Sequence, residues 1–301
     1  MQELPIAIGS FHEQKRFIER NAPFLLEFPN LNALTKKVFI RRLKLPVRAE
    51  AADEQRLPEE VPGLAASTER LTARIVFYLG RMAADDFGEI LTLAGNGRGF
   101  GAYKIVRGMY ERVVTALYLE KNPAEARAFA ESSAITRLNF LNRILEDSPG
   151  TESELGPGIL QSIQKDAAAA QAKRKQSICS KCHQPITQEA WTRVSLDAMA
   201  KAVDPSLAVL YPPFYLEGTM QAHANMFGIE RRLFCKDGAI SYKETSEDEA
   251  RFAVHLGHHL MIRVLVMQNK YFNLGHDEDV QRRADAFVAV WDGAGPPDVP
   301  L

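Results

Sequence analysis

The stretch SEDEARFAVHLGHHLMIRVLVMQNKYF, residues 246–272, predicts the central helix of this protein. Ser246 and Glu249 form a capping box, in which each side chain satisfies a free amide at the helix start. The helix that follows is apolar on nearly every side, and such a helix is surrounded by other elements rather than lying on the surface. We therefore expect an all-α fold, a multi-helix bundle built around residues 247–272.

Helical signals dominate on both sides of this segment. Apolar residues recur at helical spacing after Ser67, the glycine-rich stretch 95–101 separates two such helices, and Asn122-Pro123 begins a third. Lys236-Asp-Gly238 lies between two alternating runs and predicts a small β-hairpin near 230–244. The expected helices are 67–95, 101–121, 122–146, 159–176, 195–203, 212–227, 247–272 and 276–291.

Three regions follow from this pattern. Residues 1–63 form an N-terminal helical extension that ends in an acidic, proline-bearing linker, residues 64–292 form the helical bundle with a Cys-bearing insert near 177–187, and residues 293–301 form a flexible tail. The 301-residue chain is long enough to bury a large core without disulfides or metals.

Charge and cysteine content limit the classes of partner and the cellular compartment that we expect. Thirty-seven basic and thirty-eight acidic residues nearly cancel, so no global field favours nucleic acid or a lipid surface. We find no secretory signal in the first residues, no apolar run long enough to cross a membrane, and three cysteines, which suit a reducing compartment. The expected localisation is cytoplasmic, without a membrane partner.

Three motifs resemble a bacterial all-helical domain-of-unknown-function family, family 5677. They are GFGAYKIVRGMYE at 99–111, Trp191 followed by the Ser195-capped segment to Ala200, and Tyr215-x3-Thr219-x3-His223. Thr219 stands where serine is usual in the family, which keeps the hydroxyl. The resemblance covers residues 67–272 and implies an all-helical fold, without assigning an activity.

Arg107 and Glu111 are the first candidate functional residues. Arg107 falls within the apolar arc of its helix, and a buried guanidinium is costly unless it is paired. One interpretation is a helix-to-helix ion pair that fixes packing, aided by Gly108. The other is a polar pocket in which Arg107 holds an anion and Glu111 acts as a base or ligand.

Tyr215, Thr219 and His223 recur at every fourth residue, so they are expected to line one groove of one helix. A phenol, a hydroxyl and an imidazole that converge there could perform acid–base chemistry near neutral pH. The structural alternative is a core histidine beside a hydroxyl. If this helix contacts the Arg107 helix, the five residues Arg107, Glu111, Tyr215, Thr219 and His223 form one cluster, which we predict as the site.

Two candidate metal sites remain open. His255 and His259 are one helical turn apart, a spacing that can chelate zinc, although the glutamate of a metalloprotease motif is missing. Arg251-x6-His258 also resembles the motif of the all-helical HEPN-type ribonucleases, and packing histidines are the alternative. Cys179 and Cys182 are spaced as in a zinc knuckle, with reduced thiols in a loop as the alternative.

Two basic stretches, Lys37 to Arg48 and Lys173 to Lys181, could contact phosphates or form solvated faces. Two function classes follow. The first is an enzyme or toxin-like effector, a hydrolase or nuclease, that acts on a phosphate-bearing substrate such as RNA. The second is a non-catalytic helical binding or assembly module, a homo-oligomer for example, whose polar cluster is structural. The cofactor is not fixed by the sequence, and zinc is the candidate that these motifs favour.

Overall fold

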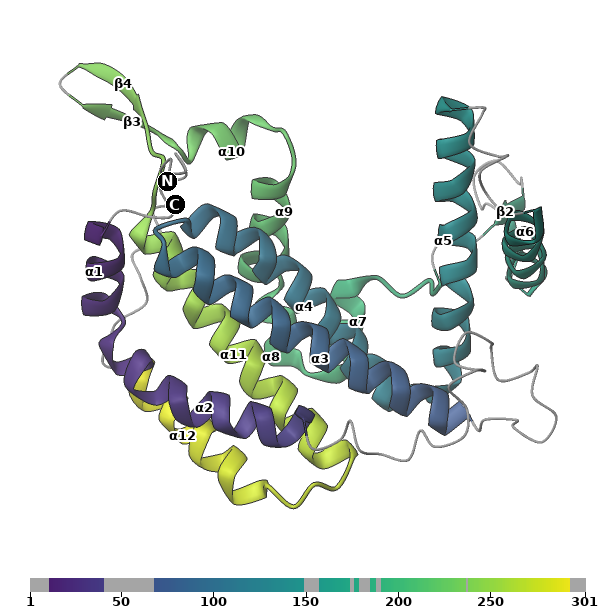
Figure 1. The fold of residues 1–301 in the computed structure, drawn as a ribbon, viewed down its shortest axis with the longest axis horizontal. Helices are drawn as coiled ribbons and strands as arrows, with labels where there is room; N and C mark the ends of the chain where they lie inside the picture. The colour runs from purple at the N-terminus through teal and green to yellow at the C-terminus, as the bar shows by residue number, and fades with distance from the viewer. Residues whose placement is uncertain are drawn as a thin grey trace, which may run out of the picture.

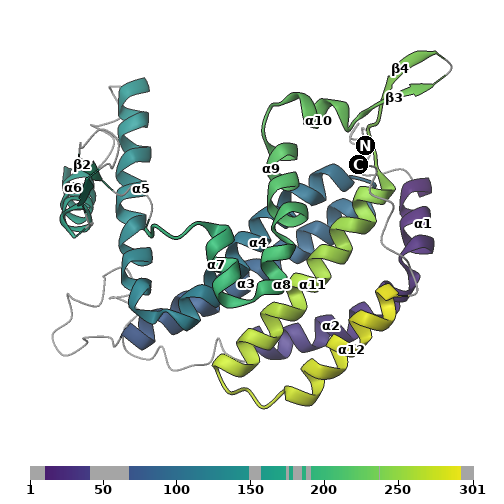
Figure 2. The same cartoon turned by 180° about the vertical axis from the view of Figure 1, so that it is seen from behind.

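The computed structural model describes residues 11–40, 68–148, 157–173, 176–178, 185–187, 191–236 and 238–292. Its centre is a layer of three long helices, α3 (Thr68–Gly95), α4 (Gly99–Lys121) and α11 (Glu247–Tyr271), which lie side by side in Figures 1 and 2. The all-α prediction is confirmed. The fully buried residues at the centre of the core include Ile90, Val106, Met109, Leu260, Met261 and Val264.

Helix α11 begins and ends as the sequence predicts. The Ser246 hydroxyl accepts a hydrogen bond from the Glu249 amide at 3.3 Å, and the two side chains also bond to each other. Gly99, at the start of α4, meets this same point, because a Cβ on Gly99 would lie 2.3 Å from the Ser246 carbonyl oxygen. Glycine is therefore what lets the α4 and α11 backbones touch.

Helices α1 (Phe11–Arg20), α2 (Ala22–Ile40) and α12 (Asp277–Asp292) cover one side of this layer (Figure 1). Phe24 and Leu31 of α2 are buried in the same core as α11. An ion pair between Arg283 and Glu27 joins α12 to α2, and Arg20 contacts Glu247 at 3.1 Å. The helical part of the N-terminal extension thus contributes to the main core.

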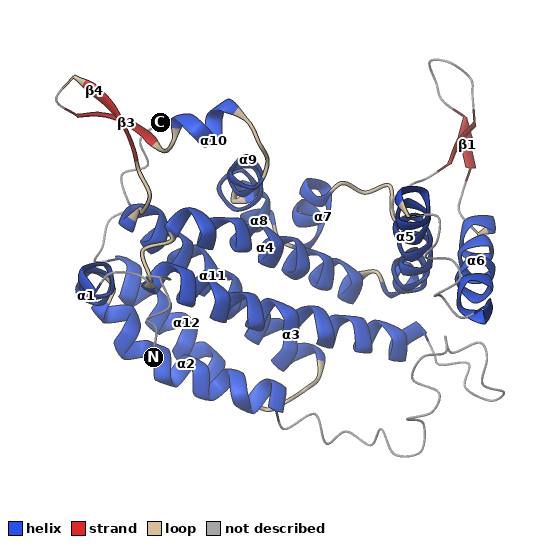
Figure 3. Ribbon diagram, turned by 45° about the horizontal axis from the view of Figure 1, so that its top comes forward, coloured by secondary structure: helices blue, strands red, loops and turns tan. Residues whose placement is uncertain are grey.

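The opposite side is made of shorter elements, α7 (Leu196–Val203), α8 (Pro205–Val209), the π-helix η5 (Pro212–Leu216), α9 (Glu217–Ala222) and α10 (Met226–Glu230). Ser195 caps α7, as predicted, by accepting a bond from the Ala198 amide. Strands β3 (Leu233–Lys236) and β4 (Ala239–Tyr242) form the predicted hairpin, which projects from the bundle in Figure 3. Gly238 in its turn has a φ of 77°.

The expected single helix over 212–227 is wrong, because the chain leaves α9 at His223. His223 has an extended backbone, with φ −102° and ψ 153°. Asn225 stabilises the break, since its side-chain amide donates to the carbonyls of Met220 and His223 while its oxygen accepts from the Gly228 amide. A short polar side chain that bonds to nearby backbone competes with the helix in this way.

The remaining elements are α5 (Ala126–Asp147), preceded by the 3-10 turn η3 (Pro123–Glu125), α6 (Pro157–Ala172), and the short strands β1 (Gln176–Ile178) and β2 (Pro185–Thr187). Helices α5 and α6 stand apart from the central layer in Figures 1 and 3. They share a small core of their own, made of Ile135, Ala167 and Ala170. Cys179 and Cys182 fall between β1 and β2 and lie outside the described residues.

Candidate functional site

Arg107 of α4 lies against η5 and α9, and it meets two of the predicted site residues there. Its Nε donates a hydrogen bond to the Thr219 hydroxyl at 2.8 Å, and its Nη2 donates to the Tyr215 hydroxyl at 3.2 Å. The guanidinium carbon also lies 4.8 Å from the centre of the Tyr215 ring, a cation–π distance. Arg107 and two residues from a distant part of the sequence, Tyr215 and Thr219, therefore form one contact group, which we call the Arg107 cluster.

Two local features bring Thr219 to Arg107. Gly218 lies directly on α4, since a Cβ there would be 2.7 Å from Cβ of Arg107 and 3.2 Å from the Tyr103 carbonyl oxygen. The Thr219 hydroxyl also donates to the Tyr215 carbonyl at 2.7 Å, which fixes its lone pairs toward the guanidinium. Close approach and a fixed hydroxyl rotamer together orient the Arg107 side chain.

The π-helix η5 supplies the third feature. The Glu217 amide bonds to the carbonyl of Pro212, five residues earlier, instead of to that of Pro213. The Pro213 carbonyl is therefore available, and the Tyr103 hydroxyl of α4 donates to it. Wide turns of this kind are frequent at functional sites. Here the wide turn joins η5 to α4 one helical turn before Arg107.

Within the described structure, the oxygen atoms that accept hydrogen bonds from Arg107 are all uncharged. Among the described residues, no carboxylate forms an ion pair with it. The nearby acids are engaged elsewhere, since Arg231 contacts Glu217 at 2.5 Å and Glu249 at 3.3 Å. Burial, followed by the charge of Glu217, raises the pKa of Tyr103 beside them. A half-buried guanidinium that keeps its full charge is suited to bind an anion.

Glu111 and His223 do not join the Arg107 cluster. Glu111 is exposed on α4, one turn beyond Arg107, and forms no hydrogen bond or ion pair with any described residue. His223 is exposed at the end of α9, where the helix that the spacing predicted has already ended. The structure therefore brings together Arg107, Tyr215 and Thr219 and leaves the other two side chains outside.

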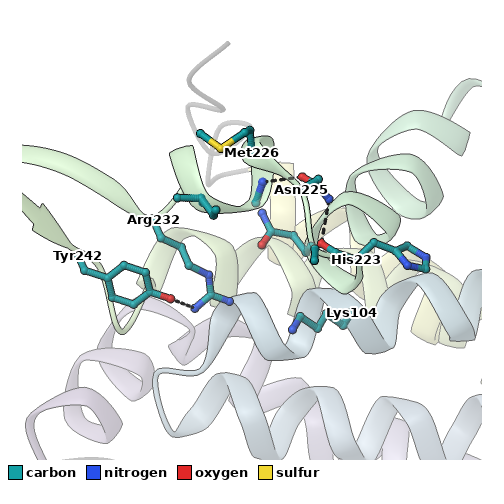
Figure 4. Close-up of a pocket in the computed structure, with 10 residues that line it drawn as sticks. Lys104, His223, Asn225, Met226, Arg232 and Tyr242 are labelled. Atoms are coloured by element: carbon teal, nitrogen blue, oxygen red, sulfur yellow. Dashed lines mark hydrogen bonds between the residues drawn. The ribbon is translucent and has the colours of Figure 1, made fainter.

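His223 instead borders an open pocket of about 540 Å³, between α4, α9, α10 and the hairpin. Figure 4 shows Lys104 and Arg232 in this pocket, with the His223 imidazole pointing away from Arg232. The sequence pattern gives no sign of this pocket or of its residues Lys104, Gln221 and Arg232. No periodic signal could have found them, because the break after Ala222 creates the pocket.

The three histidines of α11 lie among aromatic rings. His258 is completely buried, and its Nδ1 accepts a hydrogen bond from the Trp291 indole at 3.1 Å. His255 stacks on the Trp291 ring, with centroids 4.7 Å apart. Burial lowers the pKa of His258 to about 3 and those of His255 and His259 to about 4. All three rings are therefore neutral at pH 7.

These contacts give little room for a ligand at the histidines. Nε2 of His259 faces the Arg263 guanidinium, which donates to it at 3.5 Å, and a cation there would be repelled. No three His, Cys, Asp or Glu side chains gather around a common point in the described part of the chain. The zinc prediction for His255 and His259 gains no support, and that for Cys179 and Cys182 lies outside the described residues. Because it is buried, His258 has no access to a phosphate in solvent.

Two members of the predicted basic stretches are described. Lys37 contacts Asp279 at 3.3 Å, and Lys173 contacts Glu131 at 2.9 Å. Their charges are thus partly balanced within the protein. Across the helices that the structure describes, none is both long and apolar enough to span a bilayer.

Comparison with known proteins gives one match. The model of a family of unknown function (DUF5677) matches residues 74–240, more than half of the chain, and this segment contains the whole Arg107 cluster. No curated protein and no solved structure matches.

Proposed function

The chain belongs to the family of unknown function DUF5677, and we propose from the geometry of its site that it binds a phosphate-bearing ligand through Arg107. The observation that carries the proposal is that uncharged oxygens hold this guanidinium, with no carboxylate ion pair among the described residues. A structural arginine in a helix interface is normally neutralised by an acid. Arg112, on the same helix α4, forms such an ion pair with Asp86 of α3. The Arg107 charge is therefore available for a ligand.

The chemistry of the guanidinium selects the ligand class. Arginine presents a rigid fork of donors that matches phosphate oxygens, and Thr219 and Tyr215 occupy only part of that fork. Tyr211 and Tyr215 stack with ring centroids 5.2 Å apart beside it, and both are partly exposed. An anion at Arg107 would thus lie next to an aromatic surface, a combination that suits phosphate esters with an organic group.

The test is binding of inorganic phosphate to the full chain, followed by calorimetry and by thermal unfolding. Phosphate is expected to raise the unfolding temperature, and Arg107→Gln should weaken binding about tenfold or more. Arg107→Lys keeps the charge but loses the fork and should give an intermediate affinity. The matched control is Arg143→Gln, which removes an exposed arginine of α5. Equal phosphate affinity in Arg107→Gln and Arg143→Gln would exclude the proposal.

A catalytic form of this proposal gives Glu111 and His223 the proton transfers of phosphodiester hydrolysis, while Arg107 stabilises the developing negative charge. Both side chains are exposed on the elements that carry the cluster or border it. Glu111→Gln and His223→Ala should each abolish cleavage of a fluorogenic RNA and leave the unfolding temperature unchanged. Retained cleavage in both variants would exclude Glu111 and His223 as the proton-transfer groups, and absence of cleavage by the parent chain would limit the function to binding.

The second candidate is an assembly module, and the apolar surface of α10 and the hairpin favours it. Single exposed apolar residues are ordinary, but a contiguous group of them is characteristic of interaction sites. Sedimentation of the full chain over a range of concentrations tests for a homo-oligomer. The exposed apolar residues of this surface are Met226, Phe227, Ile229, Leu233, Phe234 and Ile240.

A further inference from the structure

The pocket beside the Arg107 cluster has a one-sided charge. It is bordered by Lys104 of α4 and by Arg232 at the base of the hairpin, and none of its lining residues is an acid. Its volume of about 540 Å³ falls within the range of about 300 to 1,000 Å³ that small-molecule sites occupy. The pocket shares no residue with the Arg107 cluster, so it is a separate site.

Gln221 is the second and independent sign of a ligand. This side chain borders the pocket and is only 7% exposed. Neither its amide nitrogen nor its amide oxygen has a hydrogen-bond partner within the described structure. A buried polar group without a partner is unfavourable, and such groups in native proteins need an explanation. Here a ligand that offers both an acceptor and a donor would satisfy the amide.

Arg232 is held in place for an anion. Its guanidinium donates to the Tyr242 hydroxyl at 3.1 Å (Figure 4). The guanidinium carbon also lies 4.3 Å from the centre of the Phe100 ring. No described carboxylate forms an ion pair with it, because Glu217 and Glu249 contact the neighbouring Arg231 instead. Stacking orients the guanidinium plane without neutralising it. Lys104, which is exposed, adds a second positive charge to the same pocket.

The outer wall of the pocket is apolar and aromatic. Met226, Ile229 and Tyr242 border it and are largely exposed, at 63%, 48% and 56%. Such side chains can pack against a flat apolar ring, and without a ligand they remain exposed to solvent. The pocket therefore offers three kinds of contact in one place: two cations, one amide with a free donor and acceptor, and an apolar wall.

We infer that this pocket binds a nucleoside monophosphate, either free or as the terminal nucleotide of a strand. Lys104 and Arg232 would bind the phosphate, Gln221 would pair with the donor and acceptor on one edge of the base, and Met226 and Ile229 would cover the base face. A glutamine amide pairs in this bidentate way with N6 and N7 of adenine. Arg107, Tyr215 and Thr219 do not line this pocket, so nucleotide binding here does not depend on phosphate binding at Arg107.

The experiment measures binding of AMP, GMP, CMP and UMP to the full chain by calorimetry, with inorganic phosphate and adenosine as part ligands. A 5′-phosphorylated oligoribonucleotide in the same assay distinguishes a free nucleotide from a strand end. At least one monophosphate should bind about tenfold more tightly than inorganic phosphate because of its base, and Arg232→Gln should weaken binding of that monophosphate about tenfold through the lost phosphate contact. Lys36→Gln, which changes an exposed lysine of α2, is the matched charge control.

Gln221→Met is the decisive variant, because it keeps the side-chain volume and removes the two unpaired amide atoms. The unliganded protein should unfold at an equal or higher temperature, while the nucleotide loses about tenfold in affinity and inorganic phosphate is unaffected. If the four monophosphates bind no better than inorganic phosphate, or if Gln221→Met binds them as the parent does, the inference is overturned.

Discussion

The indole nitrogen of Trp291 donates a hydrogen bond to Nδ1 of His258 at 3.1 Å, deep between α11 and α12. Nδ1 must therefore be unprotonated, and the single proton of the neutral ring lies on Nε2, which is buried without a partner. A second proton on His258 would break the bond to Trp291. The packing of α12 against α11 therefore requires these histidines to be neutral.

This pairing predicts that acid destabilises the protein. The folded pKa of His258 is about 3, against 6.5 for the unfolded residue, because of burial first and the neighbouring histidines second. Between these values the unfolded chain binds the extra proton, so the free energy of unfolding falls as the pH decreases from 6.5 toward 4. His258→Asn keeps an acceptor for Trp291 and should reduce this fall between pH 6.5 and 4.5 by about 2 kcal/mol in urea unfolding.

Other ionisable groups surround these histidines and also contribute to the pH dependence of stability, so the parent and the His258→Asn variant must be compared. Arg251 and Arg263 lower the pKa of the neighbouring histidines, Asp204 raises that of His259, and the pKa of buried Asp86 is raised to about 6, which favours folding at low pH. These contributions are common to the parent and the variant, so the difference between their profiles isolates His258. His12→Asn, at an exposed position of α1, serves as control. Identical pH profiles for His258→Asn and the parent would contradict the prediction.

Gly99→Ala tests the contact between α4 and α11. The new methyl would lie 2.3 Å from the Ser246 carbonyl oxygen and 2.4 Å from the Ala250 amide nitrogen, and both are backbone atoms that cannot move aside. We expect a loss of about 3 kcal/mol in the free energy of unfolding. Gly88→Ala, where nothing lies within 4 Å, should instead stabilise α3 by about 0.5 to 1 kcal/mol. Similar denaturant midpoints for the two variants would refute this close contact.

Gly218→Ala changes the spacing of α4 and α9 without changing any side chain of the Arg107 cluster. The added methyl meets Cβ of Arg107 at 2.7 Å, so α9 must move away from α4 and Thr219 must leave the guanidinium. We expect a stability loss of about 1 to 3 kcal/mol together with weaker phosphate binding, measured by unfolding and calorimetry. Unchanged phosphate binding despite lower stability would mean that the spacing between α4 and α9 does not matter for the ligand.

Thr219→Val and Thr219→Ser form a matched pair. Valine keeps the shape but removes the oxygen that accepts from Nε of Arg107, and this costs about 1 kcal/mol of stability because the half-buried donor loses its partner. Serine keeps the hydroxyl and should behave like the parent in both unfolding and phosphate titrations. If valine and serine have the same effect, the hydroxyl does not position Arg107.

The helical framework follows from local signals that need no tertiary information. The capping box at Ser246 and the apolar surface of α11 predict both the position of this helix and its burial. Ser195 predicts the start of α7 in the same way, and the turn at Gly238 predicts the hairpin. Each depends on residues within a few positions of one another, where sequence patterns are informative.

The site was predictable only in part, for a physical reason. Repetition at every fourth residue correctly groups Tyr215 with Thr219, and both contact Arg107. The same repetition fails for His223, because Asn225 bonds to the backbone and ends α9 first. Gln221 and Arg232 come together across that break, and their grouping depends on contacts between elements that no periodicity records. The assignment of His223 and Glu111 to the catalytic site stays a prediction.

The wide turn at Pro212–Leu216 determines which side of α9 faces α4. If one residue were deleted there and the segment wound as an ordinary helix, Thr219 would turn by about 100° and shift by about 1.5 Å along the axis. Its hydroxyl would then face solvent instead of α4. The length of this short segment, rather than the identity of its side chains, thus governs whether the threonine and the arginine can meet, so an indel here would be costlier than most substitutions.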